Sequence, residues 1–159
     1  MDTCSVLFVC TANLCRSPTA QGILRKICAE RGLDWVRVDS AATHGHGAGS
    51  APDPRSQAHA AQRGVDISDL RARRITDDDF ARADLILVMD WRNVRDLEQL
   101  CPPAYFSKVR RMTEFCLKAP HSEVVPDPYR GGDADFVRVL DLLQDACEGL
   151  VLHLQALRR

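Results

Sequence analysis

Short apolar runs alternate with amphipathic segments along this chain, and that order is the strongest constraint on its fold. Ser5–Val9 and Asp84–Met89 are mostly continuous apolar runs, as expected for strands that are buried on both faces. Trp35–Asp39 alternates apolar and polar residues like a strand, and Lys108–Met112 has the composition of a short fourth strand. Strands that alternate with helices form parallel sheets with right-handed crossovers and helices on both faces. We therefore predict an α/β domain of this kind.

Helical patterns fill the segments between the predicted strands. The clearest start lies at Ser17 and Pro18, where we expect the serine to be the N-cap and the proline to open the helix. Residues 44–54 and 126–132 are rich in turn-forming residues and are predicted to be loops. The predicted helices are Thr19–Arg31, Ser56–Arg63, a short helix opened by Thr76–Asp79, Trp91–Leu100 and Asp133–Arg159.

The composition is that of a soluble globular protein. The chain has 159 residues, of which 45% are hydrophobic and 27% charged, with a formal net charge of −1. This length predicts one domain over residues 1–159, and the balanced charge predicts no general attraction to nucleic acid or to an anionic membrane. The longest apolar runs have five residues, whereas a membrane-spanning helix needs roughly 20. The N-terminus also lacks the pattern of a secretory signal, so we expect a cytoplasmic protein without membrane insertion.

The seven cysteines indicate the redox environment and one candidate for chemistry. An odd number of cysteines without an export signal is typical of reduced thiols in a cytosol. No Cys-x-x-Cys pair occurs, so we expect no structural zinc site. Cys28 and Cys147 fall in predicted helices, and most of the thiols are expected to pack as small hydrophobic groups. Cys10 differs, because it ends the first strand at the sheet edge where parallel sheets bind ligands.

The segment Cys10–Ser17 joins that strand to the next helix. A tight loop before a helix can direct successive backbone N–H groups inward and form an anion-binding nest. Arg16 adds a planar guanidinium that can grip two phosphate oxygens, and the same positive field stabilises a thiolate at Cys10. Ser17 is placed to cap the helix and to donate to Cys10 Sγ. The pattern predicts a thiolate nucleophile below a phosphate pocket and a cysteinyl-phosphate intermediate, although a cysteine that ends a buried strand is also a common core residue.

Phosphoryl transfer of this kind needs an acid that protonates the leaving oxygen and later activates water. Asp127 lies in a proline-flanked loop before Tyr129, whose ring is placed to line an aromatic slot. Asp53 lies between two prolines in the same local pattern, and both Pro-Asp-Pro segments are also ordinary turn sequences. The residues by themselves leave both aspartates as candidates.

Several segments, spread over nearly the whole chain, resemble the low-molecular-weight protein tyrosine phosphatases. In the family's order they are Val6–Cys10, Asn13–Pro18, Asp39–Thr43, Pro52–Arg55, Ala72–Thr76, Met89–Asp90 and Asp127–Tyr129. This resemblance implies a single three-layer domain with a four-stranded parallel sheet. It also implies hydrolysis of phosphotyrosine in partner proteins and of small aryl phosphates, with no metal and no organic cofactor. No residue predicts the oligomeric state.

The resemblance also assigns roles to residues. It makes Cys10 the nucleophile, Arg16 the phosphate clamp and Asp127 the general acid and base. Cys15 falls on a family position where a second cysteine traps the oxidised nucleophile as a reversible disulfide, with simple loop packing as the alternative. Ser17 would assist the thiolate, and Asn13 with Ser40 would hold the loop in shape. The phosphate-binding loop and its support would then comprise Thr11, Ala12, Asn13, Leu14, Cys15, Ser17 and Ser40.

Some positions depart from the family pattern. Ala12 replaces a glycine, so it has either an ordinary backbone conformation or a strained one. Leu70 replaces a histidine that supports the loop, and Asp69 is a candidate substitute. His46 occupies the place of an aromatic residue that stacks on the substrate ring. The expected substrate rim comprises His46, Tyr129 and Arg130, with added positive charge from Arg71, Arg73 and Arg74.

The sequence is also compared with the patterns of other functions. His44 and His46 form a His-Gly-His segment that is a weak metal-binding pattern without an evident third ligand. By the family resemblance, a phosphoarginine phosphatase of the same fold would carry threonine at the position of Leu14, where an apolar wall favours a phenyl ring instead. An arsenate reductase needs a further cysteine pair, and residues 71–100 contain none. A phosphate-binding module without catalysis is disfavoured by the presence of Cys10, Arg16 and Asp127.

Overall fold

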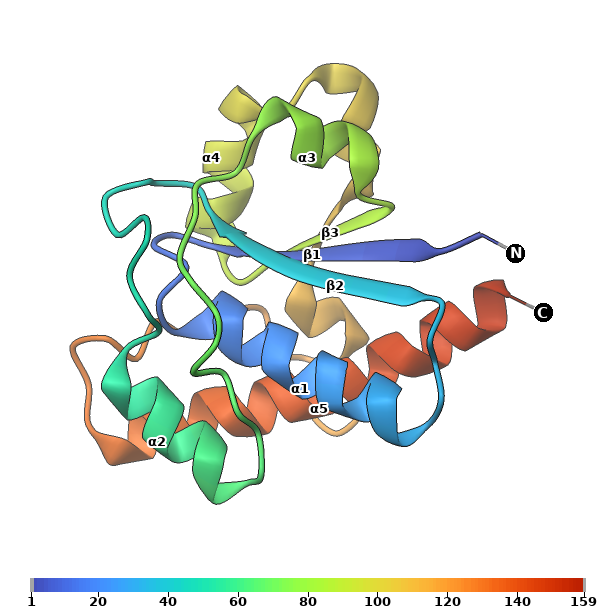
Figure 1. Ribbon diagram of the computed structural model, residues 1–159. Coiled ribbons are helices and arrows are strands. Elements are labelled where there is room, and N and C mark those ends of the chain that lie inside the picture. The colour runs from blue at the N-terminus through green and yellow to red at the C-terminus, as the bar shows by residue number, and fades with distance from the viewer. Residues whose placement is uncertain (1, 159) are drawn as a thin grey trace.

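Four parallel strands form the central sheet of the protein, which a computed structural model describes from residue 2 to residue 158 (Figure 1). The strands are β1 (Cys4–Cys10), β2 (Val36–Ala42), β3 (Leu85–Val88) and β4 (Val109–Arg111), in the order β2-β1-β3-β4. β1 is therefore central, and its Phe8 pairs with Ser40 on one side and Leu87 on the other. All the strand directions agree, so the carboxyl ends of the strands meet at one edge.

Helices cover both faces of this sheet, which confirms the predicted three-layer α/β architecture. Figure 1 shows α1 (Arg16–Glu30), α2 (Pro54–Gln62) and α5 (Asp133–Leu157) on one side. The helices α3 (Asp77–Arg82) and α4 (Trp91–Leu100) lie on the other side. Two short 3₁₀ helices that the sequence did not predict, η1 (Pro103–Lys108) and η2 (Met112–Phe115), flank β4.

The alternation of side chains along β1 produces two hydrophobic cores. Val6 and Phe8 face the core that is formed with α1 and α5, whereas Leu7 and Val9 face the core that is formed with α3 and α4. β3 is buried along its whole length, as expected for a strand covered on both faces. The inward residues predicted for the last helix are all buried: Phe136, Val139, Leu140, Leu143 and Leu150.

The first helix begins earlier than its capping pattern indicated. It starts at Arg16 rather than Thr19, and Cys15 rather than Ser17 is the N-cap residue. Ser17 does not cap the helix because its hydroxyl is hydrogen-bonded to the side chains of Cys10 and Asn13. The prediction that Ser17 caps the helix is therefore wrong, whereas the predicted contact of Ser17 with Cys10 is present.

The second strand is longer than its alternating pattern indicated. It continues to Ala42 instead of ending at Asp39, because residues 40–42 pair with the buried end of β1. β1 itself extends the predicted strand by one residue at each end. This extension brings the loop that follows β2 to the carboxyl edge of the sheet, beside the end of β1.

Most of the other boundaries lie within a few residues of their predictions. α2 begins at Pro54, two residues early, because Asp53 caps it by accepting a hydrogen bond from the backbone N–H of Arg55. Thr76 caps α3 in a capping box with Asp79. α4 matches its prediction, and α5 ends at Leu157 while residue 159 lies outside the described residues. None of the helices described here combines the length and apolar character that crossing a bilayer requires.

Candidate active site

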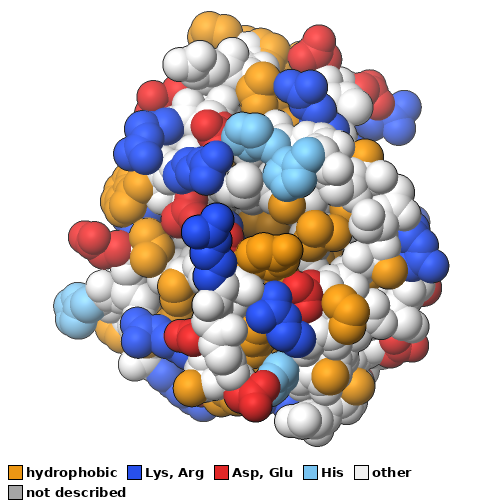
Figure 2. Space-filling model, turned by 90° about the vertical axis from the view of Figure 1, so that its left-hand side faces the viewer, with side chains coloured by type: hydrophobic (Ala, Val, Ile, Leu, Met, Phe, Trp, Pro, Cys, Tyr) orange, Lys and Arg blue, Asp and Glu red, His pale blue; other side chains and the backbone are white. Residues whose placement is uncertain are grey.

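The loop between β1 and α1 surrounds a pocket at the carboxyl edge of the sheet. The pocket encloses about 260 Å³. On this face of the molecule, Figure 2 shows a hollow with hydrophobic side chains on its floor and histidine and basic side chains along its border. The pocket-lining residues are Cys10, Thr11, Ala12, Leu14, Cys15, Arg16, His46, Asp127 and Tyr129. The structure thus brings together the predicted catalytic residues and most of the predicted loop.

The backbone of this loop offers a run of free hydrogen-bond donors. Within residues 2–158, no protein group accepts a hydrogen bond from the backbone N–H groups of residues 11–17. Buried backbone donors are almost always paired in folded proteins. A run of unpaired N–H groups at a helix N-terminus is therefore suited to an anion, which the positive end of the α1 dipole also favours.

Arg16 is held beside the pocket by two partners on one edge of its guanidinium. Its side chain is 3% exposed, and Nη1 donates to Asp90 Oδ2 at 2.6 Å and to the Val125 carbonyl at 3.0 Å. Nη2 lies 3.9 Å from Asp127 Oδ2 and, like Nε, has no hydrogen-bond acceptor among the described residues. The paired edge fixes the guanidinium plane, and the free edge remains available to a phosphate.

The charge of Arg16 is secured by its neighbours. Burial alone would lower the pKa of Arg16, but the negative charge of a Cys10 thiolate and the hydrogen bond and charge of Asp90 outweigh it. The pKa of Arg16 is therefore raised above its ordinary value. The guanidinium stays positive in spite of its burial, as a phosphate site needs.

Cys10 Sγ lies at the end of a buried hydrogen-bond chain. It is 3.0 Å from Ser17 Oγ, and Ser17 Oγ accepts a hydrogen bond of 2.7 Å from Asn13 Nδ2. Because the amide of Asn13 is the donor there, the hydroxyl hydrogen of Ser17 is free to point at the sulfur. This arrangement stabilises a thiolate by hydrogen bonding.

Asn13 has the one left-handed backbone among the non-glycine residues described, with φ of +59°. Asparagine tolerates this conformation better than most residues. Ala12 does not have a positive φ, so its backbone has the ordinary conformation and not the strained one. The glycine-to-alanine departure therefore leaves the loop backbone without strain at residue 12.

The amide of Asn13 also ties the loop to two distant segments. Its Nδ2 donates to Ser40 Oγ at 2.9 Å, and its Oδ1 accepts from the backbone N–H of Arg73 at 3.1 Å. Asp69 does not provide the substitute support considered for the missing histidine, because its carboxylate is paired with Arg25 at 3.0 Å. Leu70, at the position of that histidine, packs against the larger core instead.

The two candidate aspartates differ in where their carboxylates point. Asp127 lines the pocket, and its side chain is 55% exposed. Asp53 does not line it, because its carboxylate accepts hydrogen bonds from the backbone and the guanidinium of Arg55. These hydrogen bonds hold the pKa of Asp53 below its usual range, so Asp53 is ionised and poorly suited to donating a proton.

The Arg55 guanidinium connects Asp53 to the loop that carries Asp127. Its Nη2 donates to the Tyr129 carbonyl at 2.8 Å, and the guanidinium lies over the Tyr129 ring at 5.5 Å from the ring centre. Sequence reasoning identified no role for Arg55, because its partner carbonyl lies 74 residues further along the chain. Within the Asp127 loop, the backbone N–H of Tyr129 donates to Asp127 Oδ1 at 3.1 Å.

The predicted substrate rim is only partly assembled around the pocket. His46 and Tyr129 line it, whereas Arg130 is exposed and does not. Arg73 adds no free charge there, because its guanidinium is paired with Asp39 and Asp79, each at 2.9 Å. Hydrogen bonds from Arg73 and Thr76 outweigh the effect of burial and hold the pKa of Asp79 low, which keeps this pair charged.

Cys15 is buried in the pocket wall. Burial, together with nearby acidic groups, raises the pKa of its thiol to about 12 although Ser56 hydrogen-bonds to it. A thiol with this pKa is protonated near neutral pH and is a weak nucleophile. The other thiols pack mainly in the hydrophobic cores, and burial also raises the pKa of Cys4, Cys28, Cys101, Cys116 and Cys147.

Two further polar residues support the site, and the sequence pattern did not single out a role for either. Asp90 follows β3, caps α4 and holds Arg16. Asn93 is fully buried, accepts hydrogen bonds from the Met89 and Asp90 backbone, and donates to Thr11 Oγ1 at 3.3 Å. Both residues follow a strand at the carboxyl edge of the sheet, and this position was the signal by which the sequence could have identified them as site residues. Within residues 2–158, no group of His, Cys, Asp and Glu side chains is arranged to hold a metal ion.

Comparisons with known proteins agree with this geometry. The family model for low molecular weight phosphotyrosine protein phosphatase matches residues 5–159. The human low molecular weight phosphotyrosine protein phosphatase is 38% identical over 151 residues, which are 94% of each chain. A crystal structure of an Entamoeba histolytica protein tyrosine phosphatase, with Hepes in its active site, has a TM-score of 0.93 at 35% identity and covers 99% of this chain and 100% of its own.

One solved structure with the same fold is named for a different substrate. The structure of a Drosophila arginine phosphatase has a TM-score of 0.86 at 30% identity, with 93% of this chain and 96% of that chain covered. The fold therefore does not by itself distinguish between these substrates. The family model and the relatives nonetheless span almost the whole chain, and the human and Entamoeba histolytica proteins are named tyrosine phosphatases, which are phosphoester hydrolases. The chain belongs to the low molecular weight phosphotyrosine protein phosphatase family.

Proposed function

We propose that this protein hydrolyses phosphotyrosine in proteins, and small aryl phosphates, through a cysteinyl-phosphate intermediate. The observation that carries the proposal is the convergence of three groups on one pocket. These are the sulfur of Cys10, the free edge of the Arg16 guanidinium and the unpaired N–H groups of residues 11–17. Together they match a nucleophile placed below a bound dianion. The proposal treats residues 1–159 as one cytoplasmic catalytic domain that needs no cofactor.

In the first step, the Cys10 thiolate attacks phosphorus. The sulfur–phosphorus bond forms as the bond from phosphorus to the aryl oxygen breaks, and Asp127 gives its proton to that oxygen so that a neutral phenol leaves. The Arg16 guanidinium and the loop N–H groups hold the equatorial oxygens, on which the transition-state charge is spread. Ser17 supports the thiolate before attack through its hydroxyl.

In the second step, water replaces the sulfur. The Asp127 carboxylate takes a proton from the water as its oxygen bonds to phosphorus, and the sulfur–phosphorus bond breaks to restore the thiolate. Inorganic phosphate is released. Asp127 suits both roles because it faces the pocket without a short ion pair, at 3.9 Å from Arg16.

The walls of the pocket favour an aromatic leaving group. The Leu14 side chain is half-buried and lies against Gly47, and Tyr129 lines the same pocket with its exposed ring. A phenyl ring buries apolar area between such walls, whereas the guanidinium of phosphoarginine would lose hydration there. We therefore place phosphotyrosine ahead of phosphoarginine, which is the second candidate. His46 and Arg130 are proposed to contact the substrate outside this slot.

Cys15 is proposed to guard the nucleophile against oxidation. If peroxide converts Cys10 to a sulfenic acid, the Cys15 sulfur bonds to the Cys10 sulfur while the Cys15 thiol proton passes to the sulfenic hydroxyl, which leaves as water. The resulting disulfide is reduced by external thiols. The high pKa of Cys15 keeps this thiol inert during turnover. Cys15→Ser should therefore leave catalysis largely intact but make inactivation by peroxide irreversible to added thiol.

The first experiment measures hydrolysis of free phosphotyrosine, p-nitrophenyl phosphate and phosphoarginine by the purified protein. We expect kcat/KM for phosphotyrosine to exceed that for phosphoarginine. Cys10→Ser should abolish turnover of all three while the circular dichroism spectrum is unchanged. Turnover by Cys10→Ser would show that the nucleophile is wrong, and a preference for phosphoarginine would reverse the substrate assignment.

The acid is tested by comparing two aspartate variants. Asp127→Ala should slow the hydrolysis of phosphotyrosine more than that of p-nitrophenyl phosphate. The phenolate of tyrosine is a poor leaving group that needs protonation, whereas p-nitrophenolate leaves without it. Asp53→Ala is the matched control and should affect both substrates equally. Equal losses for Asp127→Ala, or a leaving-group dependence for Asp53→Ala, would transfer the acid role away from Asp127.

A further inference from the structure

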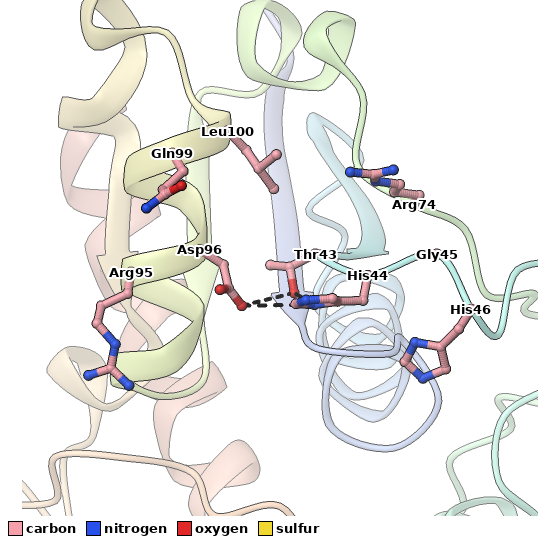
Figure 3. A pocket seen from close by; sticks show the side chains of 9 residues that line it. All are labelled: Thr43, His44, Gly45, His46, Arg74, Arg95, Asp96, Gln99 and Leu100. Carbon is pink, nitrogen blue, oxygen red and sulfur yellow. Dashed lines mark hydrogen bonds and ion pairs between the residues drawn. The ribbon is translucent and has the colours of Figure 1, made fainter.

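A second, wider hollow lies beside the catalytic pocket. It measures about 620 Å³ and separates the loop that follows β2 from the outer face of α4. Figure 3 shows Arg74 and His46 on one side of it and Arg95, Asp96 and Gln99 on the other. Its lining residues are Thr43, His44, Gly45, His46, Arg74, Arg95, Asp96, Gln99 and Leu100, and we call it the α4 groove.

The α4 groove adjoins the catalytic pocket. His46 lines both hollows. The loop between them is fixed to the nucleophile loop, because the Thr43 backbone N–H donates to the Cys10 carbonyl and that of His44 to the Thr11 carbonyl, each at 3.0 Å. The groove is thus within reach of a peptide whose phosphotyrosine occupies the pocket, on the other side of His46.

Basic side chains outnumber acidic ones in the lining of the α4 groove, with Arg74 and Arg95 against Asp96. Arg74 and Arg95 are exposed, and neither forms an ion pair with another described residue. In contrast, the neighbouring Arg73 has two carboxylate partners. The two guanidinium groups of the groove are thus free to bind carboxylates from outside the molecule.

The one acidic side chain of the groove lining is engaged locally. Asp96 accepts a hydrogen bond of 3.4 Å from Thr43 Oγ1 and lies 3.9 Å from His44 Nδ1 (Figure 3). It faces the loop after β2 rather than either arginine of the groove. Asp96 therefore holds the groove wall in place and leaves the guanidinium charges available.

We propose that the α4 groove binds acidic side chains that flank the phosphotyrosine of a protein substrate. This inference rests on the proposed function and adds a sequence preference to it. An extended peptide advances at most about 3.3–3.6 Å per residue, so side chains one to three residues from the phosphotyrosine reach a hollow that adjoins the pocket. Carboxylates are the peptide groups that arginine binds best.

The test compares phosphotyrosine peptides that differ only in flanking charge. One peptide has two glutamates before the phosphotyrosine, another has two after it, and their controls have glutamine at the same positions. With the wild-type enzyme at low ionic strength, we expect kcat/KM to be about fivefold higher for one of the glutamate peptides than for its glutamine control. High salt should reduce this ratio towards one.

Arginine variants assign the preference to the groove. The double variant Arg74→Ala/Arg95→Ala should lower the glutamate-to-glutamine ratio to about one, and Arg74→Glu/Arg95→Glu should invert it. The matched control Arg37→Ala/Arg82→Ala removes the same charge at the amino ends of the strands, where both residues line a separate hollow, and should keep the wild-type ratio. Each kcat/KM is divided by the same enzyme's value for p-nitrophenyl phosphate, which reaches only the catalytic pocket.

The outcomes separate this inference from the proposed function. Equal ratios for the wild type and Arg74→Ala/Arg95→Ala, or an equal loss in Arg37→Ala/Arg82→Ala, would overturn the groove as the cause. No preference for either glutamate peptide would also overturn it, even if the enzyme hydrolysed phosphotyrosine well. Failure to hydrolyse p-nitrophenyl phosphate and every peptide would instead contradict the proposed function itself.

Discussion

Replacing Asn13 by alanine or by glycine separates two ways in which this residue holds the nucleophile loop. Its buried amide makes three hydrogen bonds, to Ser17, Ser40 and the Arg73 backbone, and its own backbone has a left-handed φ of +59°. Both substitutions remove the hydrogen bonds. Only alanine also places a β-carbon in a conformation that it disfavours.

The sizes of these effects follow from the structure. Three buried hydrogen bonds at about 1 kcal/mol each give a loss of about 3 kcal/mol in the free energy of unfolding. Alanine at positive φ adds about 1 kcal/mol, so we expect about 4 kcal/mol for Asn13→Ala and about 3 kcal/mol for Asn13→Gly. For a chain of this length, a difference of about 1 kcal/mol corresponds to roughly 2–4 °C in Tm.

The assay is urea denaturation together with kcat/KM for p-nitrophenyl phosphate. Asn93 is the matched control, because it is also a fully buried, hydrogen-bonded asparagine but lies in the first turn of α4 with a helical backbone. At position 93 the order of the two variants should reverse, with a free energy of unfolding about 0.5–1 kcal/mol lower for Asn93→Gly than for Asn93→Ala. If Asn13→Gly proved no more stable than Asn13→Ala, the argument from backbone strain would fail. A total loss below about 1 kcal/mol would refute the hydrogen-bond estimate.

Three further predictions concern other parts of the molecule. Asp90→Asn removes the charge that holds Arg16, so we expect kcat/KM for p-nitrophenyl phosphate to fall about tenfold and inhibition by phosphate to weaken. Tm should also fall, because the buried guanidinium loses its neutralising charge. Gly149→Ala should cost several kcal/mol in urea denaturation, since the added methyl would overlap a backbone carbonyl of η2, whereas Gly132→Ala, with open space around it, should cost less than about 1 kcal/mol. In Asp145, backbone N–H groups outweigh burial and hold the pKa below its ordinary value, so its stabilisation is present above the unfolded pKa of about 3.9 and is lost as pH falls through the folded one. Asp145→Asn should therefore lower the free energy of unfolding by about 1–2 kcal/mol at pH 7 and by much less below about pH 3; an equal loss at both pH values would contradict the ionic explanation.

Much of the fold could be predicted because it depends on local patterns. The apolar run before Cys10 and the acidic helix start at Thr76–Asp79 act over a few residues, so those elements lie close to their predicted bounds. The prediction was wrong where a distant partner overrides the local signal. Ser17 has the sequence of an N-cap, but Cys10 and Asn13 use its hydroxyl, and the helix begins at Arg16 instead.

The sequence by itself determined the parallel α/β order, the strand-to-helix loop with Cys10 and Arg16, and two candidates for the acid, of which the family resemblance favoured Asp127. Only the tertiary structure decided which aspartate faces the pocket, because Arg55 occupies the carboxylate of Asp53 and not that of Asp127. It also placed Asp90 on Arg16, 74 residues away, and opened a basic groove beside the pocket. The physical reason is that hydrophobic periodicity specifies the elements, whereas hydrogen bonds and ion pairs form only after packing brings separate loops to one edge of the sheet.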